Sequence, residues 1–139
     1  MKYWDSSALV SIVVEEPRTR LLRTMRQDDP EQTVWCLSEV EIAAALARRE
    51  REGADAGPIE TAREDLSKLV RRWRPVTAVE AVRARALRLV RTHPLRAADA
   101  LQLAAALVAS DDKPEGMPFV CLDDRLRDAA RREGFPVLP

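Results

Sequence analysis

Short apolar segments alternate with longer segments of helical period along the whole chain. Three of the short segments, at residues 2–4, 33–37 and 119–122, are rich in aromatic and β-branched residues and predict β-strands. Two briefer segments, at residues 76–77 and 136–138, predict further strands. Strands that alternate with helices are typical of βαβ units. The pattern therefore predicts an α/β fold with a central parallel sheet of four to five short strands flanked by helices in three layers.

Seven segments show the apolar spacing expected of amphipathic helices. The runs GADAGP, THPL and DDKPEGMP between them contain Gly, Pro and Asp, which favour loops. The predicted helices span about residues 6–14, 38–52, 58–71, 79–91, 96–110 and 124–133, with one more that opens at Pro17 and has Leu21, Leu22 and Met25 on its apolar face. A chain of 139 residues without internal repeats is expected to form a single domain, residues 1–139.

The composition restricts the possible function classes. The 23 basic and 23 acidic residues cancel, so any nucleic acid must be bound through local patches rather than by the overall field of the protein. His93 is the one histidine, and Cys36 and Cys121 form no C-x-x-C pair, which argues against a zinc site. The two cysteines are expected as buried, reduced thiols of a cytoplasmic protein. No apolar run approaches the about 20 residues that cross a bilayer, so no membrane association is expected.

Four acidic residues follow predicted strands or begin predicted helices. Asp5 directly follows the first strand, and Asp123 directly follows the strand at 119–122. Ligands of open parallel sheets bind at the carboxyl ends of the strands, so both side chains are expected at that edge. Each Asp also fits a purely structural role, because Asp is a favoured helix N-cap.

Glu41 and Asp99 lie near the starts of two other predicted helices. The spacing of Ser38 and Glu41 also fits a capping box, in which Glu41 would bond to the Ser38 amide. Between residues 97 and 109 the only polar residues are Asp99 and Gln102, so Asp99 is expected in apolar surroundings. A buried carboxylate needs a partner, and both Arg96 and a cation are candidates.

Together, the four acids predict a metal site. Like charges that converge at one sheet edge repel one another unless a cation neutralises them. Ligation by oxygen alone selects Mg²⁺ or Mn²⁺ over zinc or copper. Such an ion would activate a water molecule for in-line hydrolysis of a phosphodiester. Arginines could hold the phosphates of such a substrate: Arg96 and Arg125 are the nearest to the acids in the sequence, and Arg18, Arg20, Arg23 and Arg26 could flank the groove.

The chain resembles PIN-domain nucleases and, within them, the VapC-type toxins of toxin–antitoxin pairs. The resemblance rests on YWDSSALV, SEVEIAAAL, LRAADALQLAAAL and FVCLDDRLRDAA, which occur in the family's order and cover the whole chain, and on the ending GFPVLP. These blocks match the family's four acids at Asp5, Glu41, Asp99 and Asp123. At two positions the chain departs from the family: it has Cys121 in place of the usual Thr or Ser, and Gln102 where many relatives carry His.

The resemblance implies a PIN-like fold and a metal-dependent endoribonuclease that acts as a toxin. It also implies a homodimer and a VapB-type antitoxin whose tail covers the acid pocket. An alternative is a degenerate PIN module that binds RNA or a protein partner without cleaving RNA. Receiver and haloacid-dehalogenase folds also place an Asp after the first strand. The dehalogenase pattern needs a second Asp where this chain has Ser7, and the receiver needs a Lys after a late strand that this chain lacks.

Overall fold

A computed structural model describes all residues, 1–139, and contains one five-stranded sheet. All pairs of neighbouring strands are parallel, in the order β3-β2-β1-β4-β5. The strands are β1 (Tyr3–Trp4), β2 (Thr33–Trp35), β3 (Arg74–Val76), β4 (Phe119–Val120) and β5 (Val137–Leu138). The predicted α/β fold with a central parallel sheet is confirmed, and β1 lies at its centre.

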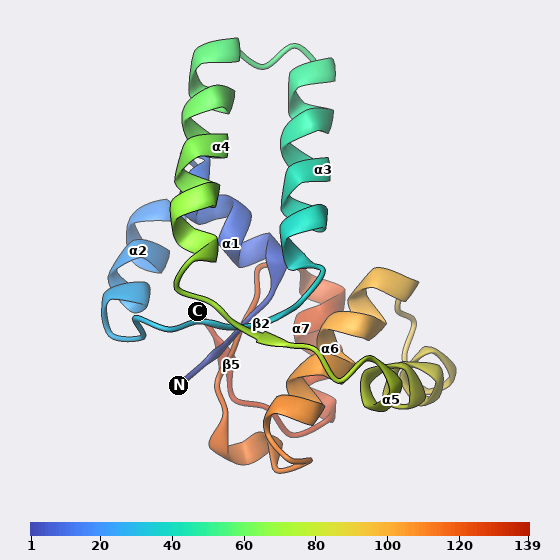
Figure 1. Cartoon of the computed structure of the whole chain (residues 1–139). Helices are drawn as coiled ribbons and strands as arrows, with labels where there is room; N and C mark the ends of the chain where they lie inside the picture. Colours follow the sequence, from blue (N-terminus) through green and yellow to red (C-terminus); the bar gives the residue numbers. More distant parts are fainter.

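Helices cover both faces of the sheet in three layers (Figure 1). One layer holds α1 (Ser6–Val13), α2 (Thr19–Gln27), α3 (Ser38–Arg51) and α4 (Ala56–Val70), and the other holds α5 (Val79–Thr92), α6 (Ala97–Ala109) and α7 (Asp124–Arg132). A short 3₁₀ turn, η1 (Pro114–Gly116), precedes β4. The hairpin of α3 and α4 projects beyond the rest of the molecule (Figure 1). None of the helices has the length and apolar character needed to cross a membrane.

The pleat of the strands divides the hydrophobic core into two halves. Successive side chains of a strand point to opposite faces, so adjacent residues enter different layers. Trp4 and Val120 pack with α1–α4, whereas their neighbours Tyr3 and Phe119 pack with α5–α7. The rings of Tyr3 and Phe119 stack at a centroid distance of 5.3 Å. Because both faces of the central strands are buried, the sheet is a rigid base for the loops at its edge.

The second predicted helix differs from the structure at its start. It begins at Thr19 rather than at Pro17. The buried Thr19 hydroxyl donates to the carbonyl of Ser11 at 2.6 Å, which fixes the turn between α1 and α2. Of the residues expected on its apolar face, Leu22 is fully buried, but 43% of Leu21 is exposed, so the prediction was wrong for Leu21.

Leu22 and Leu21 offer a matched test of this packing. We expect Leu22→Ala to lower the free energy of unfolding by about 2–5 kcal/mol, because it leaves a cavity under α2. Leu21→Ala, the same change on the exposed side, should stay within about 0.5 kcal/mol of the unsubstituted protein. Urea denaturation followed by circular dichroism measures both. Equal effects of the two changes would contradict the placement of α2.

Candidate active site

The four predicted acids line one open cleft at the carboxyl edge of the sheet. The cleft has a volume of about 710 Å³, and its lining includes Asp5, Glu41, Asp99 and Asp123. Asp5 follows β1 and Asp123 lies three residues after β4, while Glu41 and Asp99 lie in the first turns of α3 and α6. The topology thus brings together side chains that are far apart in the sequence. Carboxyl ends of parallel strands meet at one edge of the sheet, which is the physical reason.

Asp5 and Asp123 also cap helices. An Asp5 carboxylate oxygen accepts from the amide of Ser7 at 3.0 Å at the start of α1. An Asp123 oxygen accepts from the amide of Leu126 at 2.9 Å at the start of α7. The capping role and the position in the cleft therefore coexist. An N-cap at the end of a strand fixes the carboxylate at the sheet edge, where the partial positive charge of the helix N-terminus stabilises it.

Asp5 is buried and has side-chain donors around it. The hydroxyl of Ser7 donates to the same carboxylate oxygen, and the thiol of Cys121 lies 3.5 Å from it. Burial, followed by the nearby charge of Asp5, raises the pKa of the Cys121 thiol. The thiol therefore keeps its proton and can act as a donor. In this chain, Ser7 and Cys121 together supply donors on the side of Asp5 where the family carries a hydroxyl at position 121.

Glu41 does not form the capping box that its spacing allowed. Ser38 is the first residue of α3 and Leu37 is the cap, so the predicted bond to the Ser38 amide is absent. One Glu41 oxygen instead accepts from the Ser6 hydroxyl at 2.7 Å. The other accepts from the Gln102 side-chain amide at 3.1 Å. Both oxygens of Glu41 are thus held by residues of other helices.

Asp99 is half-buried, less enclosed than its apolar neighbours in the sequence suggested. No ion pair joins it to Arg96, the rival partner considered for it. Burial raises the pKa of Asp99, and the charge of Asp123 raises it further. The backbone and charge of Arg96 and the charge of Arg125 act in the opposite direction. Asp99 therefore lies in the cleft without a direct counter-ion.

Burial and mutual repulsion disfavour the ionised forms of the cleft carboxylates. Burial raises the pKa of Asp5 and of Glu41, and hydrogen bonds to each carboxylate oppose the shift. The charge of Asp99 raises both values, and Asp5 also acts on Glu41. Folding has placed these carboxylates where the charged form is disfavoured. Such a site is favourable for a cation.

The donor set fits a hard divalent ion in chemistry and in charge. It consists of carboxylate and hydroxyl oxygens, which Mg²⁺ and Mn²⁺ prefer. As the side chains lie, no three His, Cys, Asp or Glu residues are gathered closely enough to hold an ion. The carboxylates interact electrostatically across the cleft. To bind a metal ion together, they would have to move closer to one another. His93, the one histidine, bonds to Glu133 at 2.6 Å and does not line the cleft.

Arginines line the cleft, but not all of those expected. Arg96 and Arg125 do, together with Arg48 and Arg49 of α3. Arg49 pairs with Glu16 at 2.6 Å, whereas Arg48, Arg96 and Arg125 form no ion pair. The expectation for the arginines before and within α2 was wrong, because none of them lines the cleft: Arg18, Arg20, Arg23 and Arg26.

The sequence contained a signal for the arginines of α3. Residues at i, i+4, i+7 and i+8 share one face of a helix. Glu41, Ala45, Arg48 and Arg49 have this spacing, and all four line the cleft. Once Glu41 was placed at the sheet edge, the helical period alone would have identified Arg48 and Arg49.

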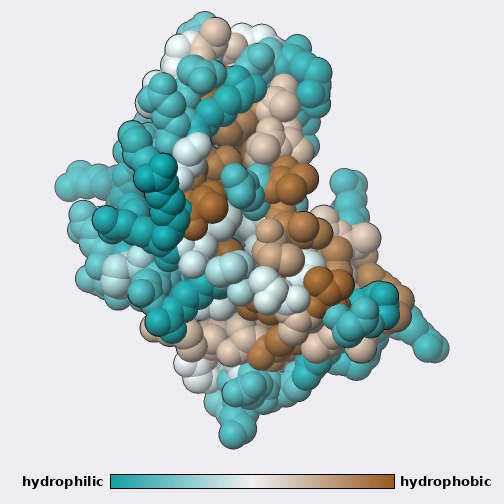
Figure 2. All heavy atoms as spheres, in the orientation of Figure 1, coloured by the Kyte–Doolittle hydropathy of each residue, from teal (hydrophilic) through white to brown (hydrophobic).

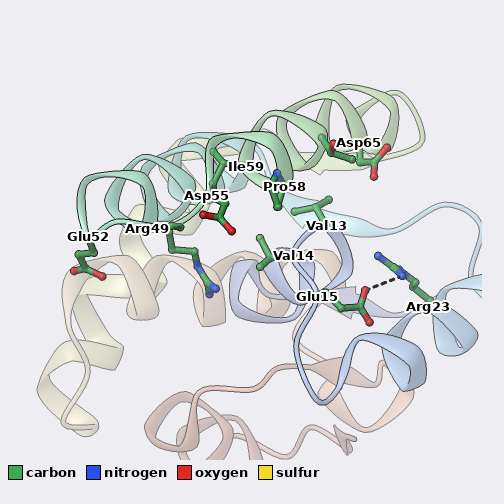
Figure 3. A pocket seen from close by; sticks show the side chains of 12 residues that line it. Val13, Val14, Glu15, Arg23, Arg49, Glu52, Asp55, Pro58, Ile59 and Asp65 are labelled. Carbon is green, nitrogen blue, oxygen red and sulfur yellow. Dashed lines mark hydrogen bonds and ion pairs between the residues drawn. The ribbon is translucent and has the colours of Figure 1, made fainter.

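A second hollow of about 710 Å³ lies between α1 and the far ends of α3 and α4 (Figure 3). Its lining includes Val13, Val14 and Ile59, and the ion pair between Arg23 and Glu15 lies on one wall (Figure 3). It contains none of the four acids. The chemistry of the lining therefore assigns the candidate active site to the acid cleft.

Comparisons with known proteins agree with this geometry. The sequence pattern of the PIN domain matches residues 2–132. The chain is 30% identical over 138 residues to Ribonuclease VapC45 of Mycobacterium tuberculosis strain CDC 1551 / Oshkosh. It has the same identity to Ribonuclease VapC49 of M. tuberculosis strain ATCC 25618 / H37Rv, and each alignment covers 99% of this chain and 94% of the relative. The chain therefore belongs to the PIN-domain family.

Proposed function

We propose that this protein is a metal-dependent endoribonuclease that hydrolyses phosphodiester bonds of RNA. The observation that carries the proposal is the gathering of four carboxylates from separate elements around one cleft. The full-length similarity to two proteins named ribonucleases supports RNA as the substrate. A PIN module that only binds would need no such concentration of mutually repelling acids.

Asp5, Glu41, Asp99 and Asp123 are the residues that would hold Mg²⁺ or Mn²⁺. When bound, such an ion lowers the pKa of a water molecule and offsets charge that develops on the phosphate. Asp5 is the most restrained of the four, because it is buried and accepts from Ser7 and Cys121. The side chains of Ser6 and Gln102 restrain Glu41 in the same way.

The unpaired arginines of the cleft suit the RNA backbone. A guanidinium binds a phosphate through two parallel hydrogen bonds. Arg48, Arg96 and Arg125 line the cleft without an ion pair, so their donors are free for a strand that passes the acids. They come from α3, from the residue before α6 and from α7. They would hold the phosphates on either side of the bond to be cut.

The proposed biological role is that of a cytoplasmic toxin inhibited by an antitoxin of the VapB type. The names of the two relatives support this role. We further propose a homodimer. Exposed apolar side chains lie at the start of α3 and on α5: Leu37, Val40, Val79, Leu87 and Val90. Figure 2 shows apolar, brown atoms on the face turned toward the viewer, below the α3–α4 hairpin and toward the region of α5. Contiguous exposed apolar surface is typical of protein interfaces.

Metal dependence tests the reaction directly. Cleavage of RNA by the purified protein should require Mg²⁺ or Mn²⁺ and stop on addition of EDTA, because the carboxylates alone provide no activated water. Restoring the metal in excess should restore cleavage. Undiminished cleavage in the chelator would refute the mechanism, and binding of RNA without cleavage in either metal would favour the degenerate module.

Asp99→Asn tests the role of the acids. Asn keeps the shape of the side chain but removes the charge. Activity in Mn²⁺ should fall by more than the about 10–100-fold that the loss of an outer-shell partner of a metal ligand costs. Because burial and Asp123 raise the pKa of Asp99, its ionised form is less favourable in the folded protein than in the unfolded chain. The melting temperature in EDTA should therefore hold or rise.

The two readouts of Asp99→Asn separate the site from a structural role. Asp99 forms no ion pair with Arg96. The substitution Asp99→Asn therefore does not deprive Arg96 of a partner. A strongly destabilised variant that kept its specific activity would show that Asp99 is structural.

Val40→Glu tests the homodimer. Val40 is 64% exposed, so Glu is tolerated in an isolated chain but places a charge in an apolar interface. Size-exclusion chromatography with light scattering should show a dimer for the unsubstituted protein and a monomer for the variant. Glu39→Gln, at the adjacent exposed position, is the control and should leave the dimer intact. A monomer in all three samples would refute the homodimer.

A further inference from the structure

Glu41 is restrained differently from the two aspartates that cap helices. Asp5 and Asp123 accept from backbone amides of the helices that they begin. Glu41 instead depends on side chains from two other helices: Ser6 of α1 at one carboxylate oxygen and Gln102 of α6 at the other, at 2.7 and 3.1 Å. Its position in the cleft is therefore a product of tertiary packing rather than of its own helix.

The Gln102 side chain is fully buried, and both ends of its amide form hydrogen bonds. Its nitrogen donates to Glu41 and to the hydroxyl oxygen of Ser38 at 3.0 Å, and its oxygen accepts from the hydroxyl of Tyr3 at 2.7 Å. The chemistry allows only one orientation of this amide. An ionised carboxylate accepts but does not donate, so the nitrogen must face Glu41 and the oxygen must face Tyr3.

A restraint on Glu41 has a physical purpose. Asp5 and Asp99 line the same cleft, and their negative charges repel the Glu41 carboxylate. A glutamate side chain has three torsions through which it can turn away toward solvent. The donors of Ser6 and Gln102 oppose that movement. Gln102 contributes from the buried side, where no water competes for the bond.

We propose that Gln102 is a positioning residue that holds the Glu41 carboxylate in the acid cleft for metal binding. The inference rests on the proposed function, since it assigns Glu41 to the metal site. Gln102 does not line the cleft, so it acts on the site only through Glu41. Because an amide does not titrate, it supplies its donor at every pH at which the protein is folded.

Binding of Mn²⁺ to the full chain tests the proposal without an activity assay. Gln102→Met keeps the length of the side chain and removes the donor. Isothermal titration should show affinity for Mn²⁺ weakened by about 10–100-fold, the cost of losing an outer-shell partner of a metal ligand. Tyr3→Phe is the matched control. It also removes a buried hydrogen bond from Gln102 but leaves the bond to Glu41, so its affinity should stay close to that of the unsubstituted protein.

A double-mutant cycle shows whether Gln102 acts through Glu41. In a Glu41→Gln background, Gln102→Met should cause no further loss of Mn²⁺ affinity, because the carboxylate that it positions is gone. Additive losses would overturn the proposal. Thermal melts in EDTA establish that each variant is folded. If Gln102→Met does not fold, Gln102→Asn replaces it, with an amide that falls one bond short of Glu41 and the same expected result.

The outcomes distinguish the two proposals. If the unsubstituted protein binds Mn²⁺ and Gln102→Met binds it equally well, the positioning role is refuted and the nuclease proposal stands. If the unsubstituted protein binds neither Mn²⁺ nor Mg²⁺, the metal site itself is refuted and the positioning role with it. Equal losses in Gln102→Met and Tyr3→Phe would show a general effect of core polarity, which also overturns the proposal.

Discussion

The carboxylates at the carboxyl edge of the sheet repel one another, and the hydrogen bonds around the cleft offset this repulsion. Burial and neighbouring negative charge raise the pKa of Asp5, Glu41 and Asp99 in the same direction. A folded protein tolerates this only if other interactions restrain the side chains. Here the restraints are hydrogen-bond donors: helix amides, the hydroxyls of Ser6 and Ser7 and the amide of Gln102. They lower the cost of the charges without neutralising them, so the cleft remains favourable for a cation.

The restraints work because the base beneath them is rigid. Tyr3 and Trp4 leave β1 toward opposite faces of the sheet, and each is fully buried in its own half of the core. The next residue, Asp5, is therefore fixed at the exact point where the central strand ends and α1 begins. Tyr3 also reaches Gln102 through its hydroxyl, so the core and the cleft share one hydrogen-bond network. A change in the packing of α6 against the sheet would move Gln102 and thereby alter the position of the Glu41 carboxylate.

The acids and the arginines of the cleft have separate proposed roles, metal binding and phosphate binding. The acids lie where strands end, and arginines surround them from α3, from the residue before α6 and from α7. Glu16 pairs with Arg49, while Arg48, Arg96 and Arg125 keep their donors free. A chain with no net charge thus concentrates both signs in one place. Local placement rather than overall charge gives the site its proposed attraction for metal and for phosphate.

The sequence by itself determined the alternation of strands and helices, the parallel sheet and the four acids that its edge brings together. These follow from local patterns, because apolar periodicity and helix caps are properties of neighbouring residues. Tertiary structure alone decided how Glu41 is held. Its spacing from Ser38 suggested a capping box, but Ser6 and Gln102, which are 35 and 61 positions away, hold it instead. It also decided which arginines face the cleft, since Arg23 turns to the carbonyl of Ile12 and to Glu15. Such contacts depend on how helices pack across the sheet, which no local pattern encodes.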